Sequence, residues 1–214
     1  MINAAASVPS ATEVEALIDR GLRRGREVGE ASPVYALALL NHGCLRWNQG
    51  RLEEGLHEIR HAMAIQDAIH PRPIEACIAR QVLGQREMSR GNLREAVPLL
   101  QESLPCMERA FLPGAMVLMW ARLSQLELLV LQGHFGEAAG PLDALQAEAA
   151  QRLPKARWLI AEVLLWRGRS LCKSGAADEG KRVLTQSAGL FAEEMGEQSP
   201  AVQAAGRLLP ACGK

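Results

Sequence analysis

The residues with the clearest chemical potential are two histidines in the stretch HEIRH, His57–His61. Histidines four residues apart share one face of a helix and can bind a single Zn²⁺, while the intervening Glu58 could act as a general base. This HExxH pattern is typical of zinc metalloproteases. No third ligand stands out downstream, since Met63 and Ala64 follow where an extended zinc-binding motif would continue. A zinc metalloprotease is therefore retained only as a remote alternative.

A second group with chemical potential is the cation pair Arg169 and Lys173. Two cations four residues apart lie one turn apart on a helix, where together they suit a carboxylate. The sequence contains no GxxxxGK[ST], GxGxxG or GxSxG motif, so nucleotide binding and serine hydrolysis lack support. We therefore expect no catalytic residues, no cofactor and no metal, and we predict that the protein is not an enzyme.

The composition excludes several other classes of function. Lysine plus arginine and aspartate plus glutamate both count 24, and this neutral balance argues against nucleic-acid binding. One basic run, formed by Arg20, Arg23, Arg24 and Arg26, is interpreted as a solvated helix face. The five cysteines are odd in number and widely spaced, with no CxxC pair, so we expect reduced thiols in a cytosol.

The chain shows no sign of membrane targeting. Its most apolar stretch, Ala115–Leu131, is interrupted by Arg122 and Glu127, so a membrane span is not expected. The opening residues MINAAASVPS have neither a basic nor an apolar segment of the kind found in signal peptides. We therefore predict a cytoplasmic protein.

The elements that must position these residues are organised around a turn that recurs four times. It reads GRLEEG, GNLREA, GHFGEA and GAADEG, and its first glycines are Gly50, Gly91, Gly133 and Gly175, a period of 41 or 42 residues. Helix-forming Ala, Leu, Glu, Gln and Arg dominate, whereas strand-forming residues are scarce, so the chain is expected to be all-α. Each turn should join two helices into a hairpin, and stacked hairpins should complete one another's core.

Serine and proline residues divide the chain into units. Ser10 with Glu13 forms a capping box, and Ser32-Pro33 and Ser199-Pro200 combine a helix cap with a first-turn proline. We expect a disordered N-terminus at 1–9 and a single domain at 10–214. Within it we expect a capping helix at 10–29, four hairpins at about 32–70, 72–111, 114–152 and 155–196, and a C-terminal helix at 199–209.

Small residues recur at fixed positions around each turn glycine. Five positions after it stand Gly55, Ala96, Ala138 and Gly180, while seven positions before it stand Gly43, Gly84, Leu126 and Gly168. Together with Ile59, Leu100, Leu142 and Leu184 nine positions after it, this pattern resembles the tetratricopeptide repeat, although the period is about 42 residues rather than about 34. The long repeats are similar to those of kinesin light chains and of bacterial signalling kinases and regulators. The resemblance implies an α-solenoid of four hairpins with capping helices.

The resemblance also implies where a partner would bind, because the first helices of such hairpins line a concave groove. We expect a non-catalytic scaffold or regulatory module that binds a protein or peptide there, with tryptophans as anchors and amides for the peptide backbone. Alternatives are a solvated face with the tryptophans in the core, and a sensory domain that binds a small ligand or signalling peptide. The expected groove residues are Asn41, Trp47, Asn48, Gln85, Ser89, Glu127, Trp166, Arg169 and Lys173.

Overall fold

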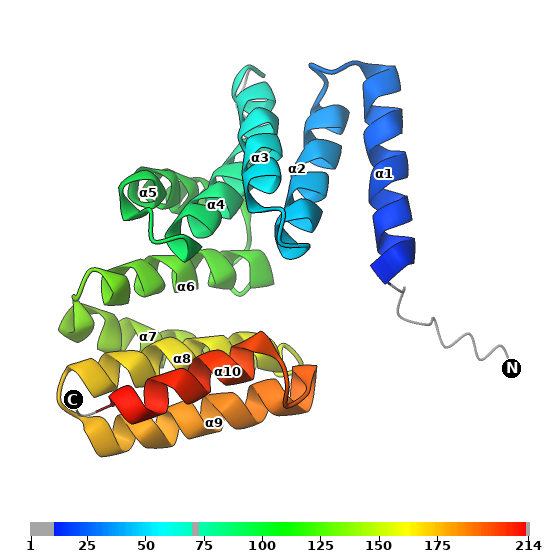
Figure 1. The fold of residues 1–214 in the computed structure, drawn as a ribbon. Coiled ribbons are helices and arrows are strands. Elements are labelled where there is room, and N and C mark those ends of the chain that lie inside the picture. The colour runs from blue at the N-terminus through cyan, green and yellow to red at the C-terminus, as the bar shows by residue number, and fades with distance from the viewer. Residues whose placement is uncertain (1–10, 70–72, 213–214) are drawn as a thin grey trace, which may run out of the picture. The chain divides into compact units, whose positions relative to one another are not determined.

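The structure, a computed structural model, describes residues 11–69 and 73–212 of the chain, and in these residues it is helical without strands. Figure 1 shows the helices following one another in antiparallel succession, as in α1–α2–α3 and α8–α9. The all-α prediction of packed consecutive helices is confirmed. The helices are α1 Ala11–Val28, α2 Pro33–Asn48, α3 Leu52–Asp67, α4 Ile74–Ser89, α5 Leu93–Ala110, α6 Met116–Leu131, α7 Phe135–Arg152, α8 Arg157–Lys173, α9 Ala177–Met195 and α10 Pro200–Leu208, followed by a short 3-10 helix η1 Leu209–Ala211.

The chain divides within α5 into two compact units, an N-terminal unit up to Glu102 and a C-terminal unit from Ser103. A single continuous solenoid domain over 10–214 stays a prediction. The expected disorder at 1–9 and the Ser10 cap lie outside the described residues. No helix in the described part of the chain is long and apolar enough to cross a membrane.

Two of the expected helix starts are confirmed by their caps. The hydroxyl of Ser32 accepts a hydrogen bond of 3.1 Å from the backbone N–H of Tyr35, and Pro33 begins α2. Ser199 accepts in the same way from Val202 at 3.4 Å, and a proline again opens the helix. The serine supplies an acceptor for an otherwise unpaired N–H, while the fixed φ of proline already suits a helix.

The four turn glycines have the backbone conformation that the repeat requires. Their φ angles are +81° at Gly50, +78° at Gly91, +86° at Gly133 and +94° at Gly175, in the left-handed region that side chains disfavour. In every copy the residue after the glycine donates its N–H to a carbonyl five residues earlier, as Arg51 does to Arg46 at 2.9 Å. This pair of features ends the first helix and reverses the chain into the second.

The small residues predicted to bring the two helices together do so. A Cβ atom on Gly55 would lie 2.6 Å from the carbonyl oxygen of Gly43 and 2.8 Å from the backbone nitrogen of Trp47. In the fourth hairpin a Cβ on Gly168 would lie 2.7 Å from Cγ of Leu184. At these glycines the two helices approach too closely for a larger residue, whereas Ala96, Ala138 and Leu126 occupy the aligned positions of the second and third hairpins.

The core of the C-terminal unit is built by three helices rather than by one hairpin. Met119 and Leu123 of α6 pack with Leu142 of α7 and with Leu159 and Val163 of α8, and all five are fully buried. The second helix of one hairpin and the first helix of the next thus form a groove that the preceding helix fills. This arrangement is the stacking expected of a repeat protein.

The prediction of reduced thiols is wrong for most of the cysteines. Cys172 of α8 and Cys212, just after η1, form a disulfide with their Cα atoms 4.7 Å apart, although 40 positions separate them in the sequence. Cys77 and Cys106 are disulfide-bonded as well, whereas Cys44 keeps a free thiol. Disulfides persist mainly in oxidising compartments, so the cysteines no longer support a cytoplasmic location, which stays a prediction.

We expect Gly55→Ala to destabilise the protein, because its methyl group would overlap the backbone of α2. Forcing extra volume into a packed site costs about 1–3 kcal/mol. Urea unfolding followed by circular dichroism measures this change. The matched control is Gly189→Ala in α9, where a Cβ has open space and alanine should stabilise the helix by up to about 1 kcal/mol. Equal effects of the two substitutions would contradict the backbone contact.

We also expect Cys212→Ser to lower the stability of the C-terminal unit under non-reducing conditions. The disulfide closes a loop of 40 residues, for which chain entropy gives about 4 kcal/mol. Scanning calorimetry of the two proteins, with and without a phosphine reductant, measures the difference. A thermal midpoint that neither the substitution nor the reductant changes would show that the bond does not constrain the chain.

Candidate functional site

The strongest candidate site lies on the first helices of the C-terminal unit, around Trp166 of α8. The side chain of Trp166 hydrogen-bonds the carboxyl group of Glu127, which comes from α6. The guanidinium of Arg169 lies over the Trp166 ring, 5.1 Å from its centroid. Three residues that the repeat register placed in the groove are therefore brought together, through a hydrogen bond and a cation–π contact.

Two carboxyl groups lie beneath this surface. Burial raises the pKa of Glu127 well above its usual range, the charge of Glu162 raises it further, and the hydrogen bond from Trp166 partly opposes the shift. Burial also raises the pKa of Glu162. The neutral form of Glu127 is thus favoured in the folded protein, because a buried charge loses its hydration. A neutral carboxyl group can still accept the hydrogen bond from the indole N–H.

A pocket of about 250 Å³ adjoins this cluster. Arg169 forms no ion pair with any other residue that the structure describes, and partial burial lowers its pKa. Sequence reasoning missed Arg207 and the rest of the α10 wall, although the Ser199-Pro200 start and the amphipathic pattern of this last helix were visible. Lys173, one turn beyond Arg169, is exposed. The pocket is lined by Leu165, Trp166 and Arg169 of α8 and by Ala204, Arg207 and Leu208 of α10.

The N-terminal unit carries a similar pair of side chains. The guanidinium of Arg86 in α4 lies over the ring of Trp47 in α2, 5.3 Å from its centroid. The thiol of Cys44 is next to Arg86, and burial raises the pKa of this thiol despite the nearby positive charge. The structure thus assembles a tryptophan–arginine pair in each unit. Arg86 was not among the expected groove residues, and it lies on the hairpin that follows the one with Trp47.

The remaining expected groove residues of this unit are less organised. Asn41 and Asn48 of α2 are exposed and form no side-chain hydrogen bond with another described residue. The exposed Ser89 donates its hydroxyl to the backbone carbonyl of Gln85 at 2.8 Å, within α4. These residues do not form a preorganised cluster. A single groove formed by these residues of both units stays a prediction.

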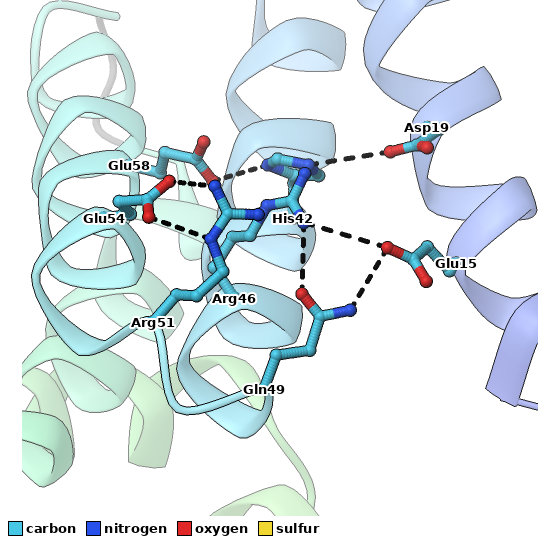
Figure 2. Close-up of polar contacts among 8 residues, drawn as sticks. All are labelled: Glu15, Asp19, His42, Arg46, Gln49, Arg51, Glu54 and Glu58. Carbon is cyan, nitrogen blue, oxygen red and sulfur yellow. Dashed lines mark hydrogen bonds and ion pairs between the residues drawn. The ribbon is translucent and has the colours of Figure 1, made fainter.

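The HExxH stretch takes part in a different set of contacts. Figure 2 shows Glu58 directed at His42 of α2, with Oε2 lying 2.6 Å from Nδ1, while Asp19 of α1 approaches the other ring nitrogen at 3.6 Å. His57 and His61 are exposed, and His61 packs edge-on against Tyr35. Among the described residues no three His, Cys, Asp or Glu side chains are grouped to hold a metal. The glutamate of the motif therefore joins α3 to α2, and His42 in turn joins α2 to α1.

We predict that Glu127→Gln changes how stability depends on pH. The folded pKa of Glu127 is raised, so the folded state holds this proton more tightly than the unfolded chain does. The contribution of Glu127 to the free energy of unfolding is therefore fully present below the unfolded pKa of about 4.3. It is lost as the pH rises toward the pKa that Glu127 has in the folded state. Glutamine keeps the acceptor for Trp166 without titrating.

Urea unfolding at a series of pH values measures this effect. Relative to the parent protein, Glu127→Gln should gain stability steadily as pH rises above about 4.3. The matched control is Glu95→Gln at an exposed position of α5, which should follow the parent curve. Parallel curves for parent and Glu127→Gln would show that the carboxyl group is not buried as described.

Among known proteins, the chain resembles solved structures of helical repeat proteins. No protein-family model matches the sequence, and no curated protein matches it. Solved structures do match. A crystal structure of a single-residue variant of a putative kinesin light chain with nearly identical TPR-like repeats, from Podosopora anserina, is 15% identical, with a TM-score of 0.61 over 86% of each chain. BtubC (BKLC) from P. vanneervenii is 13% identical, with a TM-score of 0.63 over 96% of this chain and 89% of that one.

A further crystal structure of the Podosopora anserina protein is 13% identical, with a TM-score of 0.58 over 90% of this chain and 100% of that one. Likenesses at such low identity concern the fold, and they extend over most of each chain. They agree with the succession of packed helices described above. The resemblance to kinesin-light-chain-type repeats is thus confirmed at the level of architecture. The chain has the tetratricopeptide-like fold, an α-helical repeat structure.

Proposed function

We propose that this protein is a non-catalytic protein- or peptide-binding module that uses the first-helix face of its repeats. The observation that carries the proposal is Arg169, a partly buried cation that lies on Trp166 beside an apolar pocket and forms no ion pair among the described residues. The buried Arg80, by contrast, is paired: it bonds Asp67 at 2.6 Å and Glu102 at 3.1 Å. A desolvated guanidinium without an ion-pair partner is suited to an external anion.

The chemistry of the pocket indicates what part of a partner it would take. Its leucine and alanine walls suit one apolar side chain, while Arg169 and Arg207 suit a carboxylate next to it. The Glu127 hydrogen bond fixes the Trp166 ring before binding, which reduces the entropy lost when a partner is held. Aromatic and arginine side chains in such clusters commonly dominate binding energy. We therefore expect a segment with an apolar residue adjacent to an acidic group.

The alternative is a sensory domain that binds a small ligand or signalling peptide. The pocket volume of about 250 Å³ lies below that of usual small-molecule sites, which favours a single side chain over a whole ligand. Titration with candidate ligands while following tryptophan fluorescence separates the two ideas, since Trp166 lines the pocket. A role in bacterial signalling is proposed from the sequence resemblance alone, and the cytoplasmic location stays a prediction.

We expect the double substitution Arg169→Glu and Arg207→Glu to weaken recognition at this site. Peptides selected from a phage-displayed random library on the parent protein provide the probes, and fluorescence anisotropy measures their dissociation constants. Replacing both cations should weaken binding by at least about tenfold, because each lost charge-assisted hydrogen bond is worth about 1.5–3 kcal/mol. The selected peptides should be rich in acidic residues next to apolar ones.

The matched control is Arg182→Glu on α9, an exposed arginine outside the pocket that pairs with Glu179 at 2.9 Å. This control should bind the selected peptides like the parent protein. Circular dichroism spectra of all variants establish that the helices are intact. Selected peptides that bind the double variant as tightly as the parent would rule out this pocket as the recognition site.

A further inference from the structure

A second candidate surface lies in the N-terminal unit. A groove of about 330 Å³ runs between α1 and α2. Large apolar side chains along it are exposed: Leu17 by 53%, Val34 by 51% and Leu37 by 47%. Exposed apolar surface of this extent at a groove is typical of a docking site. The groove is lined by Leu17, Ile18 and Gly21 of α1 and by Val34, Leu37, Ala38 and Asn41 of α2.

The repeat register identifies the counterpart of this groove in the C-terminal unit. Ile59 and Leu142 both lie nine residues after a turn glycine, in the second helix of a hairpin. Ile18 lies one period of 41 residues before Ile59, so it occupies the same position in α1. Val34 and Leu159 both lie 16 residues before a turn glycine, at the start of a first helix. The pair α1–α2 therefore corresponds to the pair α7–α8.

The counterpart groove is filled. Leu142 and Leu159 are both 0% exposed, because Met119 and Leu123 of α6 pack into the space between α7 and α8. At the equivalent place on α1 and α2 the structure describes no helix. Val34, which corresponds to the fully buried Leu159, is half exposed instead. The α1–α2 groove is thus a helix-binding position whose helix is not among the described residues.

We propose that the α1–α2 groove is a docking site for an amphipathic α-helix of a partner protein, seated as α6 is seated on α7 and α8. The docked helix would place apolar residues against Leu17, Val34 and Leu37, at the three- and four-residue spacing that Met119, Leu123, Leu126 and Val130 have in α6. In helical repeats, the side-chain ridges of one helix ordinarily pack into the groove between two others.

The charges beside the groove specify the partner further. Arg20 and Arg24 follow Leu17 by three and seven residues, so they lie along the outer edge of the same face of α1. Arg20 forms no ion pair with a described residue, and Arg24 pairs with the exposed Glu27 at 3.0 Å. A partner helix with acidic residues beside its apolar stripe complements this edge. A second copy of the chain would instead bring like charges together across a two-fold axis.

The groove is held open by contacts on the opposite face of α1. The amide of Gln49 donates to Glu15 at 3.1 Å, Arg46 lies 3.7 Å from Glu15, and Asp19 approaches His42 (Figure 2). These bonds fix α1 against α2 through side chains that point away from the apolar stripe. The position of α1 therefore does not depend on the helix that docks, and a preformed groove reduces the entropy lost on binding.

A labelled peptide tests the proposal on the full-length protein. The probe has the length of α6, keeps Met119, Leu123, Leu126 and Val130, and carries Glu or Gln at the other apolar positions for solubility and charge complementarity. We expect saturable binding by fluorescence anisotropy. Leu37→Asp should weaken it by at least about tenfold, since it places a charge in an apolar contact. A peptide with Leu123→Asp and Leu126→Asp should not bind.

The matched protein control is Leu112→Asp, at an apolar residue 82% exposed between α5 and α6, which should bind the probe like the parent. Arg169→Glu should also leave binding unchanged, which separates this site from the Trp166 pocket. The proposal is overturned if the parent shows no saturable binding or if Leu37→Asp, with an unchanged circular dichroism spectrum, binds equally well. It is also overturned if sedimentation shows a dimer that Leu37→Asp disrupts, since the occupant is then a second copy.

Discussion

A helical hairpin that closes through glycines still has apolar side chains on its outer sides, and this constraint governs the whole structure. Gly43 and Gly55 let α2 and α3 meet, yet their contact covers only part of each helix. The remaining apolar surface must be covered by a neighbouring helix of the repeat. In the C-terminal unit α6 meets this need for α7 and α8. The open groove beside α1 is the same requirement left unmet by the described residues.

Two buried ionic groups in the N-terminal unit are held by partners on neighbouring elements. Arg80 is held by Asp67 and Glu102 and donates to the carbonyl of Ala76 at 3.1 Å. Glu87, 1% exposed, bonds Arg60 and Asn92. These bonds satisfy charges that would otherwise cost several kcal/mol each. Against this background the lack of an ion pair at Arg169 among the described residues distinguishes the Trp166 pocket from a structural contact.

The Trp166 cluster and its pocket are built by side chains of three helices, α6, α8 and α10. The buried Glu127 accepts a hydrogen bond from the indole, while Arg169 lies over the ring and lines the pocket that α10 completes. The disulfide at Cys212 ties the segment just after α10 and η1 to α8, so the two walls are joined covalently close to the site. A surface held in this way would take the anionic, apolar segment proposed above without rearranging. The N-terminal pair of Trp47 and Arg86 is built instead from two successive hairpins.

The sequence by itself determined the helices, their ends and the glycine turns, because these depend on neighbours within a few residues. Ser32 caps the helix that begins one residue later, and Gly133 reverses the chain locally. The contacts of His42 with Glu58, of Arg169 with the pocket that includes Arg207, and of Cys172 with Cys212 were decided only by the tertiary structure. In each, the partners are 16 to 40 positions apart, and their meeting depends on how one hairpin packs on the next. The period fixes which helices are neighbours, but the register and tilt of packing select which side chains touch.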